Sequence, residues 1–140
     1  MLKFDEQKRL DSVNGALALR SEIEFIIDGI CKEGYKNICW LGIGGTYASC
    51  MQVEVHMKER SAINFFVENA AEYLLTGNKK VGEGTIVVIS SVTGSTAEMV
   101  DGVRKVQEAG AKVIGFIDYP DTKLADMVDY LISYPNNEQL

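Results

Sequence analysis

Residues 85–96 read TIVVISSVTGST, an apolar run that leads directly into a loop rich in hydroxyl side chains. Thr85–Ser90 is short and largely β-branched, which is typical of a parallel strand buried on both faces. Beyond the loop, the apolar residues of Met99–Val106 recur at helical spacing and predict a helix over Ser95–Ala109, which Gly110 ends. A strand followed at once by a helix is the repeating unit of α/β folds.

The same alternation of strand and helix runs through the rest of the chain. The predicted strands are Asn37–Ile43, Ile63–Glu68, Thr85–Ser90, Lys112–Ile117 and Tyr130–Tyr134. The predicted helices are an N-terminal one at about 5–33 that ends at Gly34, and then Thr46–Glu59, Ala70–Leu75, Ser95–Ala109 and Thr122–Val128. We therefore expect a single domain over residues 1–140, a three-layer α/β/α sandwich with a five-stranded parallel sheet in the order 2-1-3-4-5.

Composition and charge disfavour several classes of partner. The chain has 140 residues, of which 46% are hydrophobic and 24% charged, as in an ordinary folded domain. A formal net charge of −6 without any run of Lys or Arg argues against nucleic acid and anionic membranes as partners. The charged N-terminus and the absence of a long apolar run predict a cytoplasmic protein. One histidine and three cysteines without CxxC spacing are too few for a zinc site, so we expect no metal and no other cofactor.

Glycines and hydroxyls concentrate in two segments. Gly42–Ser49 follows the first predicted strand, and Ser90–Thr96 follows the third. In the order 2-1-3-4-5 the direction of winding reverses between these strands, and ligands bind beyond their carboxyl ends. Glycine allows close approach of the backbone, hydroxyls donate hydrogen bonds, and each loop opens a helix whose unpaired N–H groups attract anions. The two segments predict a phosphate site that contains no Lys or Arg.

The same residues also allow a purely structural interpretation, without a phosphate site. Ser95 and Glu98 have the spacing of a capping box, which would only satisfy the first turn of their helix. Gly42 and Gly44 lack the third glycine of a dinucleotide-binding fingerprint. Each loop alone is compatible with either interpretation, and their joint position at the predicted reversal favours a ligand site.

Three segments resemble the SIS (sugar isomerase) domain family. Gly44–Ser49, GGTYAS, is similar to the glycine–hydroxyl turn of that family, and Ser91–Glu98, SVTGSTAE, resembles its S-x-S-G-x-T-x-[DE] signature. Val67–Glu72, VENAAE, resembles the family's segment after the second strand, so the resemblance covers nearly the whole chain. It implies a flavodoxin-like fold, a sugar phosphate ligand, a role in carbohydrate metabolism and a homodimer.

The resemblance also implies which residues bind the phosphosugar. They are Gly44, Gly45, Thr46, Ser91, Val92, Thr93, Gly94, Ser95 and Thr96. The hydroxyls of the threonines and of Ser91 would contact the phosphate, supported by the backbone N–H groups of Gly45, Val92, Gly94 and Ser95. Thr93 keeps the hydroxyl of the usual serine, whereas Ser95 stands where several isomerising members carry an acidic residue.

Catalytic groups are harder to identify in the sequence. Aldose–ketose isomerisation and cleavage of a fructosamine 6-phosphate both need a positioned acid/base pair. The candidates are Glu68, Glu72 and His56. Helical rise places His56 more than ~10 Å along its helix from the first loop, and neither glutamate has a visible acid partner.

These features predict the N-terminal SIS domain of a longer phosphosugar isomerase or deglycase, with catalytic groups beyond Leu140 or on another subunit. The alternative is a regulatory domain that senses a phosphosugar without turning it over. A response-regulator-like domain is disfavoured, because Asp118 is a solitary acid after the fourth strand rather than one of a cluster.

Overall fold

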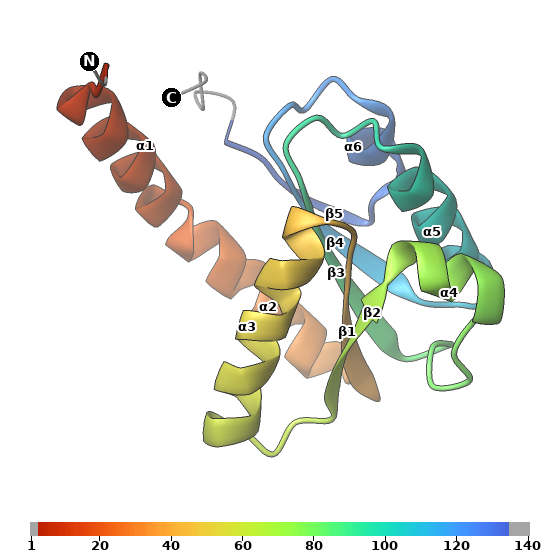
Figure 1. Ribbon diagram of the computed structural model, residues 1–140. Helices are drawn as coiled ribbons and strands as arrows, with labels where there is room; N and C mark the ends of the chain where they lie inside the picture. Colours follow the sequence, from red (N-terminus) through yellow and green to blue (C-terminus); the bar gives the residue numbers. More distant parts are fainter. Residues whose placement is uncertain (1–2, 135–140) are drawn as a thin grey trace.

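Five parallel strands form the single sheet of the computed structural model, which describes residues 3–134 (Figure 1). They are β1 (Asn37–Gly42), β2 (Phe65–Asn69), β3 (Thr85–Ser91), β4 (Lys112–Ile117) and β5 (Tyr130–Ile132). Their order in the sheet is β2-β1-β3-β4-β5, which confirms the predicted topology. Residues 135–140, which the sequence places beyond the last strand, lie outside the described part.

Helices cover both faces of the sheet. Figure 1 shows α2 (Arg20–Glu33) and α3 (Gly45–Arg60) on one side. On the other side lie α4 (Ala70–Thr76), α5 (Ala97–Glu108) and α6 (Lys123–Met127). No helix within residues 3–134 is both long enough and apolar enough to cross a membrane.

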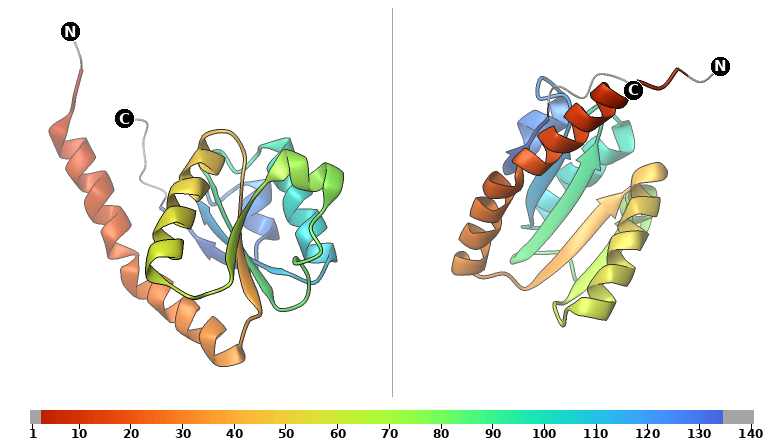
Figure 2. Two further views of the ribbon diagram at one scale, coloured as in Figure 1. Left: turned by 60° about the horizontal axis from the view of Figure 1, so that its bottom comes forward. Right: turned by 90° about the vertical axis from the view of Figure 1, so that its left-hand side faces the viewer.

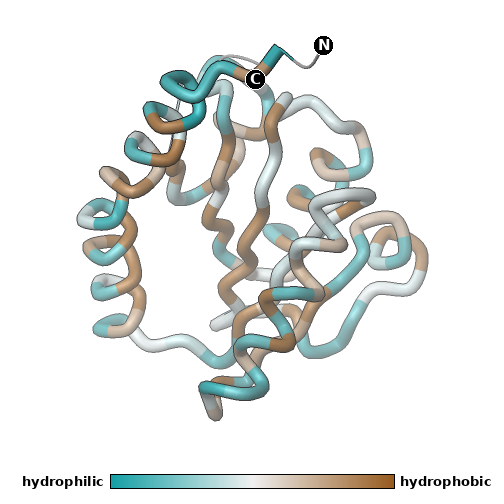
Figure 3. Tube along the Cα trace, turned by 60° about the vertical axis from the view of Figure 1, so that its left-hand side comes forward, coloured by the Kyte–Doolittle hydropathy of each residue, from teal (hydrophilic) through white to brown (hydrophobic). Residues whose placement is uncertain are grey.

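The central strand β3 is buried on both faces, as its apolar run predicts. Ile86 and Val88 belong to the cluster beneath α2, whereas Val87 and Ile89 belong to the larger cluster beneath α4, α5 and α6. Figure 3 shows hydrophobic residues running along the central strands. This two-sided core holds the carboxyl ends of β1 and β3 side by side, because the two strands are direct neighbours in the sheet.

The N-terminal segment, predicted as one helix over about 5–33, is divided at Leu19 into α1 (Glu6–Ala18) and α2. The N–H group of Leu19 donates to the Ala16 carbonyl at 3.1 Å, which is the tighter spacing of a 3₁₀ turn. Ile30 of α2 is buried against the sheet, whereas α1 buries none of its residues and extends past the sheet (Figure 2). The break therefore separates α2, which packs against the sheet, from α1, which buries none of its residues.

Several strand ends differ from the prediction by one or two residues, and the two largest differences lie in β2 and β5. The strand predicted from Ile63 begins at Phe65, and the strand predicted to reach Tyr134 ends at Ile132. Beyond Ile132, the Ser133 hydroxyl donates to the Asp118 carbonyl at 3.2 Å, so the chain there is held by a side chain rather than by the strand ladder.

Candidate functional site

The loops after β1 and β3 line one hollow at the carboxyl end of the sheet, with a volume of about 340 Å³. We call it the switch-point hollow. The residues that line it are Ile43, Gly45, Thr46, Ser90, Ser91, Val92, Thr93, Thr96 and Met99. The strands β1 and β3 are neighbours, but α3 and α5 leave them toward opposite faces, so their loops diverge here (Figure 1). The predicted reversal point is therefore the place where the two hydroxyl-rich loops meet.

Thr46 closes the β1–α3 loop with its own side chain. Its hydroxyl donates to the Ile43 carbonyl at 2.8 Å and accepts from the Ile43 N–H at 3.0 Å. This proton is therefore engaged inside the loop and does not point to a ligand. Gly45 is the first residue of α3, where N–H groups have no partner within the helix, so the backbone is the donor that this loop offers.

Glycine at position 42 lets α3 start very close to the end of β1. A Cβ atom on Gly42 would lie 2.7 Å from the backbone nitrogen of Tyr47 and 2.9 Å from Sγ of Cys50. Any larger residue would therefore push the helix away from the strand. At the turn itself, Gly44 has φ +58°, a conformation that favours glycine. Both glycines serve the shape of the loop.

The β3–α5 loop is folded around Ser91. This residue is only 9% exposed, and its hydroxyl accepts from the Gly94 N–H at 3.0 Å. Gly94 has φ +64° and allows the chain to turn back. A longer bond of 3.4 Å joins the Ser95 N–H to the Thr93 hydroxyl. The loop therefore presents its remaining hydroxyls on a tight, internally bonded turn.

The capping-box interpretation of this loop is wrong. The N-cap of α5 is Thr96, not Ser95, and no side-chain hydrogen bond caps the helix. Thr96 lines the switch-point hollow, and its hydroxyl is not used to satisfy the first turn. The structure therefore removes helix capping as the explanation for the hydroxyls of Ser95 and Thr96.

Of the nine residues predicted to bind a phosphosugar, six line the switch-point hollow: Gly45, Thr46, Ser91, Val92, Thr93 and Thr96. Gly44, Gly94 and Ser95 do not line it and instead form the turns that place the others.

Three lining residues were not among the nine predicted ones: Ile43 and Ser90, which lie within the two predicted segments, and Met99, which lies outside both. Met99 had a usable signal, because it follows Thr96 by three residues and therefore shares its face of the helix. Ser90 is the last residue of the apolar run, and its position at the carboxyl end of a switch-point strand was a second available signal.

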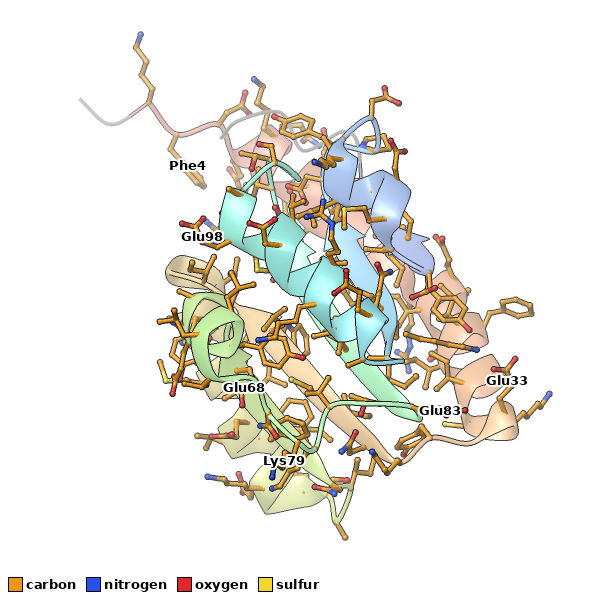
Figure 4. All side chains as sticks on the ribbon, turned by 90° about the vertical axis from the view of Figure 1, so that its right-hand side faces the viewer. Phe4, Glu33, Glu68, Lys79, Glu83 and Glu98 are labelled. Carbon is orange, nitrogen blue, oxygen red and sulfur yellow. The ribbon has the colours of Figure 1, made fainter. Side chains whose placement is uncertain are left out.

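The three catalytic candidates lie apart from the hollow. None of Glu68, Glu72 and His56 is among its lining residues. The Glu68 carboxylate accepts a hydrogen bond from the Asn78 side chain, and Figure 4 shows it well away from Glu98, which marks the start of α5. Glu72 and His56 are exposed on α4 and α3. The structure does not bring these groups together as an acid/base pair.

Neutral groups dominate the electrostatics of the site. None of the nine lining residues carries a charged side chain. Burial raises the pKa of the nearby Cys50 thiol to about 11 and raises that of Cys39 as well, so both stay protonated at neutral pH. Within residues 3–134, no three His, Cys, Asp or Glu side chains gather as metal ligands. The site offers hydroxyls, N–H groups and two helix N-termini.

The architecture is that of a doubly wound α/β domain, and its hydroxyl-lined hollow lies at the switch point, where domains of this architecture bind ligands. This chain belongs to the SIS domain family, whose domain description matches residues 34–140. This match confirms the family resemblance seen in Gly44–Ser49 and Ser91–Glu98.

Two curated relatives are glutamine–fructose-6-phosphate aminotransferases (isomerizing). The one from Methanosarcina acetivorans is 29% identical over 120 residues, which cover 79% of this chain and 18% of the relative. The one from Sulfurisphaera tokodaii is 26% identical over 117 residues, covering 82% and 19%. The chain therefore spans about a fifth of the length of these relatives.

Solved structures show the same fold. A candidate phosphosugar isomerase from Salmonella typhimurium is 28% identical with a TM-score of 0.66, over 76% of this chain and 32% of that one. A second, from Clostridium difficile, reaches a TM-score of 0.78 at 18% identity, over 94% and 38% of the two chains. The latter supports the fold alone.

Proposed function

We propose that this chain binds a phosphorylated sugar or amino-sugar conjugate, with the phosphate in the switch-point hollow, as part of a sugar-phosphate isomerase or deglycase. One observation carries the proposal: two hydroxyl-rich loops and the N-termini of α3 and α5 converge on one hollow of about 340 Å³. Helix N-termini with neutral donors are a common way to bind phosphate. Its relatives include proteins named for fructose 6-phosphate and for phosphosugar isomerisation, which supports the same ligand class.

The contacts divide the loop residues into donors and supports. Ser91 already accepts from Gly94, so its own proton is left to donate to a phosphate oxygen. Thr96 offers its hydroxyl, and Gly45 offers its backbone N–H. The Thr46 hydroxyl and the Gly94 N–H donate hydrogen bonds within the loops, so in this proposal both residues stabilise the loops and do not donate to the phosphate.

Chemistry beyond binding needs groups that the hollow does not contain. Moving a proton between adjacent carbons requires an acid/base pair, and Glu68, Glu72 and His56 all lie outside the lining. We propose that this domain anchors the phosphate while groups from elsewhere in the assembled protein perform proton transfer. Binding without turnover by the assembled protein would instead identify a phosphosugar sensor.

Calorimetry with a matched pair of ligands tests the proposal. The protein should bind glucose 6-phosphate or fructose 6-phosphate and should not bind the free hexoses. Ser91→Ala and Thr96→Ala should each remove a hydrogen bond to a charged group, about 1.5–3 kcal/mol, and weaken binding roughly tenfold or more. Thr76→Ala, an exposed hydroxyl at the end of α4, is the control and should leave the affinity unchanged. Unchanged affinity in both loop variants would overturn the site.

We also propose a homodimer that pairs through α1 and α2. Exposed apolar residues recur along one face of α1, namely Leu10, Val13 and Leu17, and α1 buries none of its residues. Apolar stripes of this kind mark association surfaces, and most soluble oligomers are twofold dimers.

The cytoplasm is the proposed location, because the free thiols of Cys31, Cys39 and Cys50 suit a reducing compartment.

A further inference from the structure

The loop between β4 and α6 packs directly against the proposed phosphate loop. A Cβ atom on Gly94 would lie 2.7 Å from Cβ of Thr122 and 3.1 Å from its Cγ2, and it would overlap the Thr122 hydroxyl. The side chain of Thr122 therefore occupies the space where a side chain at position 94 would stand. Since Gly94 also has φ +64°, two independent constraints require glycine there.

Two backbone hydrogen bonds join the proposed phosphate loop to the segment that runs from the end of β4 into α6. The Asp118 N–H donates to the Ser91 carbonyl at 3.2 Å, and the Leu124 N–H donates to the Gly94 carbonyl at 3.1 Å. Ser91 and Gly94 are themselves joined by the bond from the Gly94 N–H to the Ser91 hydroxyl, so one end of this turn is attached to the β4–α6 loop and the other to the first turn of α6. Thr122 lies between the two attachment points.

Thr122 is not used as an ordinary helix cap. It stands at the N-cap of α6, a position that favours threonine because its hydroxyl usually accepts from the first turn. Here no side-chain hydrogen bond caps α6, and the hydroxyl donates instead to the Tyr119 carbonyl at 2.9 Å. That bond fixes the side chain in the orientation in which it meets Gly94.

We propose that Thr122 is a positioning residue for the turn Ser91–Gly94, and through it for the phosphate. The inference rests on the proposed function for its ligand. Thr122 does not line the switch-point hollow, so it acts through Gly94 and not by contact with a ligand. When the bond to Tyr119 holds the Thr122 hydroxyl against Gly94, the Ser91 hydroxyl and the Val92 backbone keep one arrangement. When that bond is lost, the side chain at position 122 is no longer fixed in this orientation, and the turn samples several arrangements.

Three variants distinguish the contribution of the Thr122 hydroxyl from that of the shape of the side chain. Thr122→Ser keeps the hydroxyl and its bond to Tyr119, and it should bind inorganic phosphate and glucose 6-phosphate like the original protein. Thr122→Val keeps the shape but replaces the hydroxyl with a methyl group against Gly94, and Thr122→Ala removes both contacts. The last two should weaken binding by about 2- to 10-fold, the range expected for one hydrogen bond.

Amide hydrogen exchange of the ligand-free protein gives a second measurement that does not depend on any ligand. The amides of Gly94 and Leu124 should exchange faster in Thr122→Val and Thr122→Ala than in Thr122→Ser, while amides of β1 keep their rates. A uniform rise in all rates would indicate global destabilisation and would overturn the positioning role. Three variants that bind and exchange like the original protein would overturn it too.

The two proposals fail in different ways. If the original protein binds neither inorganic phosphate nor glucose 6-phosphate, the proposed function is wrong, and the exchange rates of Gly94 and Leu124 alone decide the role of Thr122. If it binds both but the valine and alanine variants bind equally well, the proposed function stands and the positioning role is wrong.

Discussion

Five hydroxyl residues line the switch-point hollow, namely Thr46, Ser90, Ser91, Thr93 and Thr96, and their protons are not equivalent. The Thr46 hydroxyl donates to Ile43 within its own loop. The Ser91 hydroxyl is buried and accepts from Gly94, and the Thr96 hydroxyl caps no helix. A hydroxyl in such a motif therefore either holds the loop or offers a proton to a ligand, and only its partners show which.

At the residue scale, replacing Thr46 tests this distinction. Thr46→Val keeps the shape but leaves the Ile43 N–H and carbonyl without their side-chain partner, so we expect a loss of about 1–3 kcal/mol in the free energy of unfolding. Thr46→Ser keeps the hydroxyl and should stay near the original stability. Urea denaturation measures both. If the valine variant keeps its stability and loses only phosphate binding, the hydroxyl serves a ligand directly.

The three cysteines give a second prediction at this scale. Cys31 is exposed, whereas Cys39 and Cys50 are buried with raised pKa values, that of Cys50 to about 11. At pH 8 a thiol reagent should label Cys31 quickly and the other two only after unfolding. These buried thiols ionise more readily in the unfolded chain than in the folded protein. The free energy of unfolding should therefore be unaffected below about pH 9 and should fall as the pH rises from there toward 11. Rapid labelling of all three cysteines in the folded protein would contradict this prediction.

At the scale of elements, Tyr134 makes a specific contact with α1. The Tyr134 hydroxyl donates to the Asp11 carbonyl at 2.9 Å, and the Tyr134 ring fills the position that a Cβ atom on Gly15 would occupy. The helix buries none of its own residues, so this contact and the connection through Leu19 contribute to its position.

Replacing Gly15 should release α1 without unfolding it. Gly15→Ala improves helix propensity by about 0.5–1 kcal/mol, yet its methyl group collides with Tyr134. We expect unchanged far-ultraviolet circular dichroism together with faster proteolysis near α1. Gly29→Ala is the matched control on α2, because nothing lies within 4 Å of its added Cβ atom, and it should be neutral or slightly stabilising. Equal proteolysis of both variants would show that Tyr134 does not hold the helix.

At the scale of the whole molecule, the proposed dimer can be tested by sedimentation over a range of protein concentrations. Burying one leucine is worth about 1.5–3 kcal/mol, and twofold symmetry doubles the loss. Leu17→Glu on α1 should therefore shift the protein to monomer at concentrations where the original is a dimer. Leu75→Glu on α4 is the control, because Leu75 is also highly exposed but lies on the opposite side of the sheet. A monomeric original protein would refute the dimer.

The sequence by itself determined the strands, their order and the two loops of the candidate site. Runs such as Thr85–Ser90 have a short-range pattern that is typical of a strand buried on both faces, and glycines with hydroxyls after two of these strands point to the switch point. The strands and the loops could be predicted because each depends on residues that are neighbours along the chain, whereas the strand order was predicted as a common one for a doubly wound sheet of five strands.

The tertiary structure alone decided what each site residue does. The break at Leu19 depends on where the sheet ends beneath the N-terminal helices, and the contact of Thr122 with Gly94 joins two loops that are separate in the sequence. The hydroxyl of Thr46 turns inward and that of Thr96 stays uncapped, although both stand in similar positions after a strand. The physical reason is that a hydrogen bond or a steric contact is settled by which groups the folded chain brings within a few ångströms, and no local pattern of residue types contains that information.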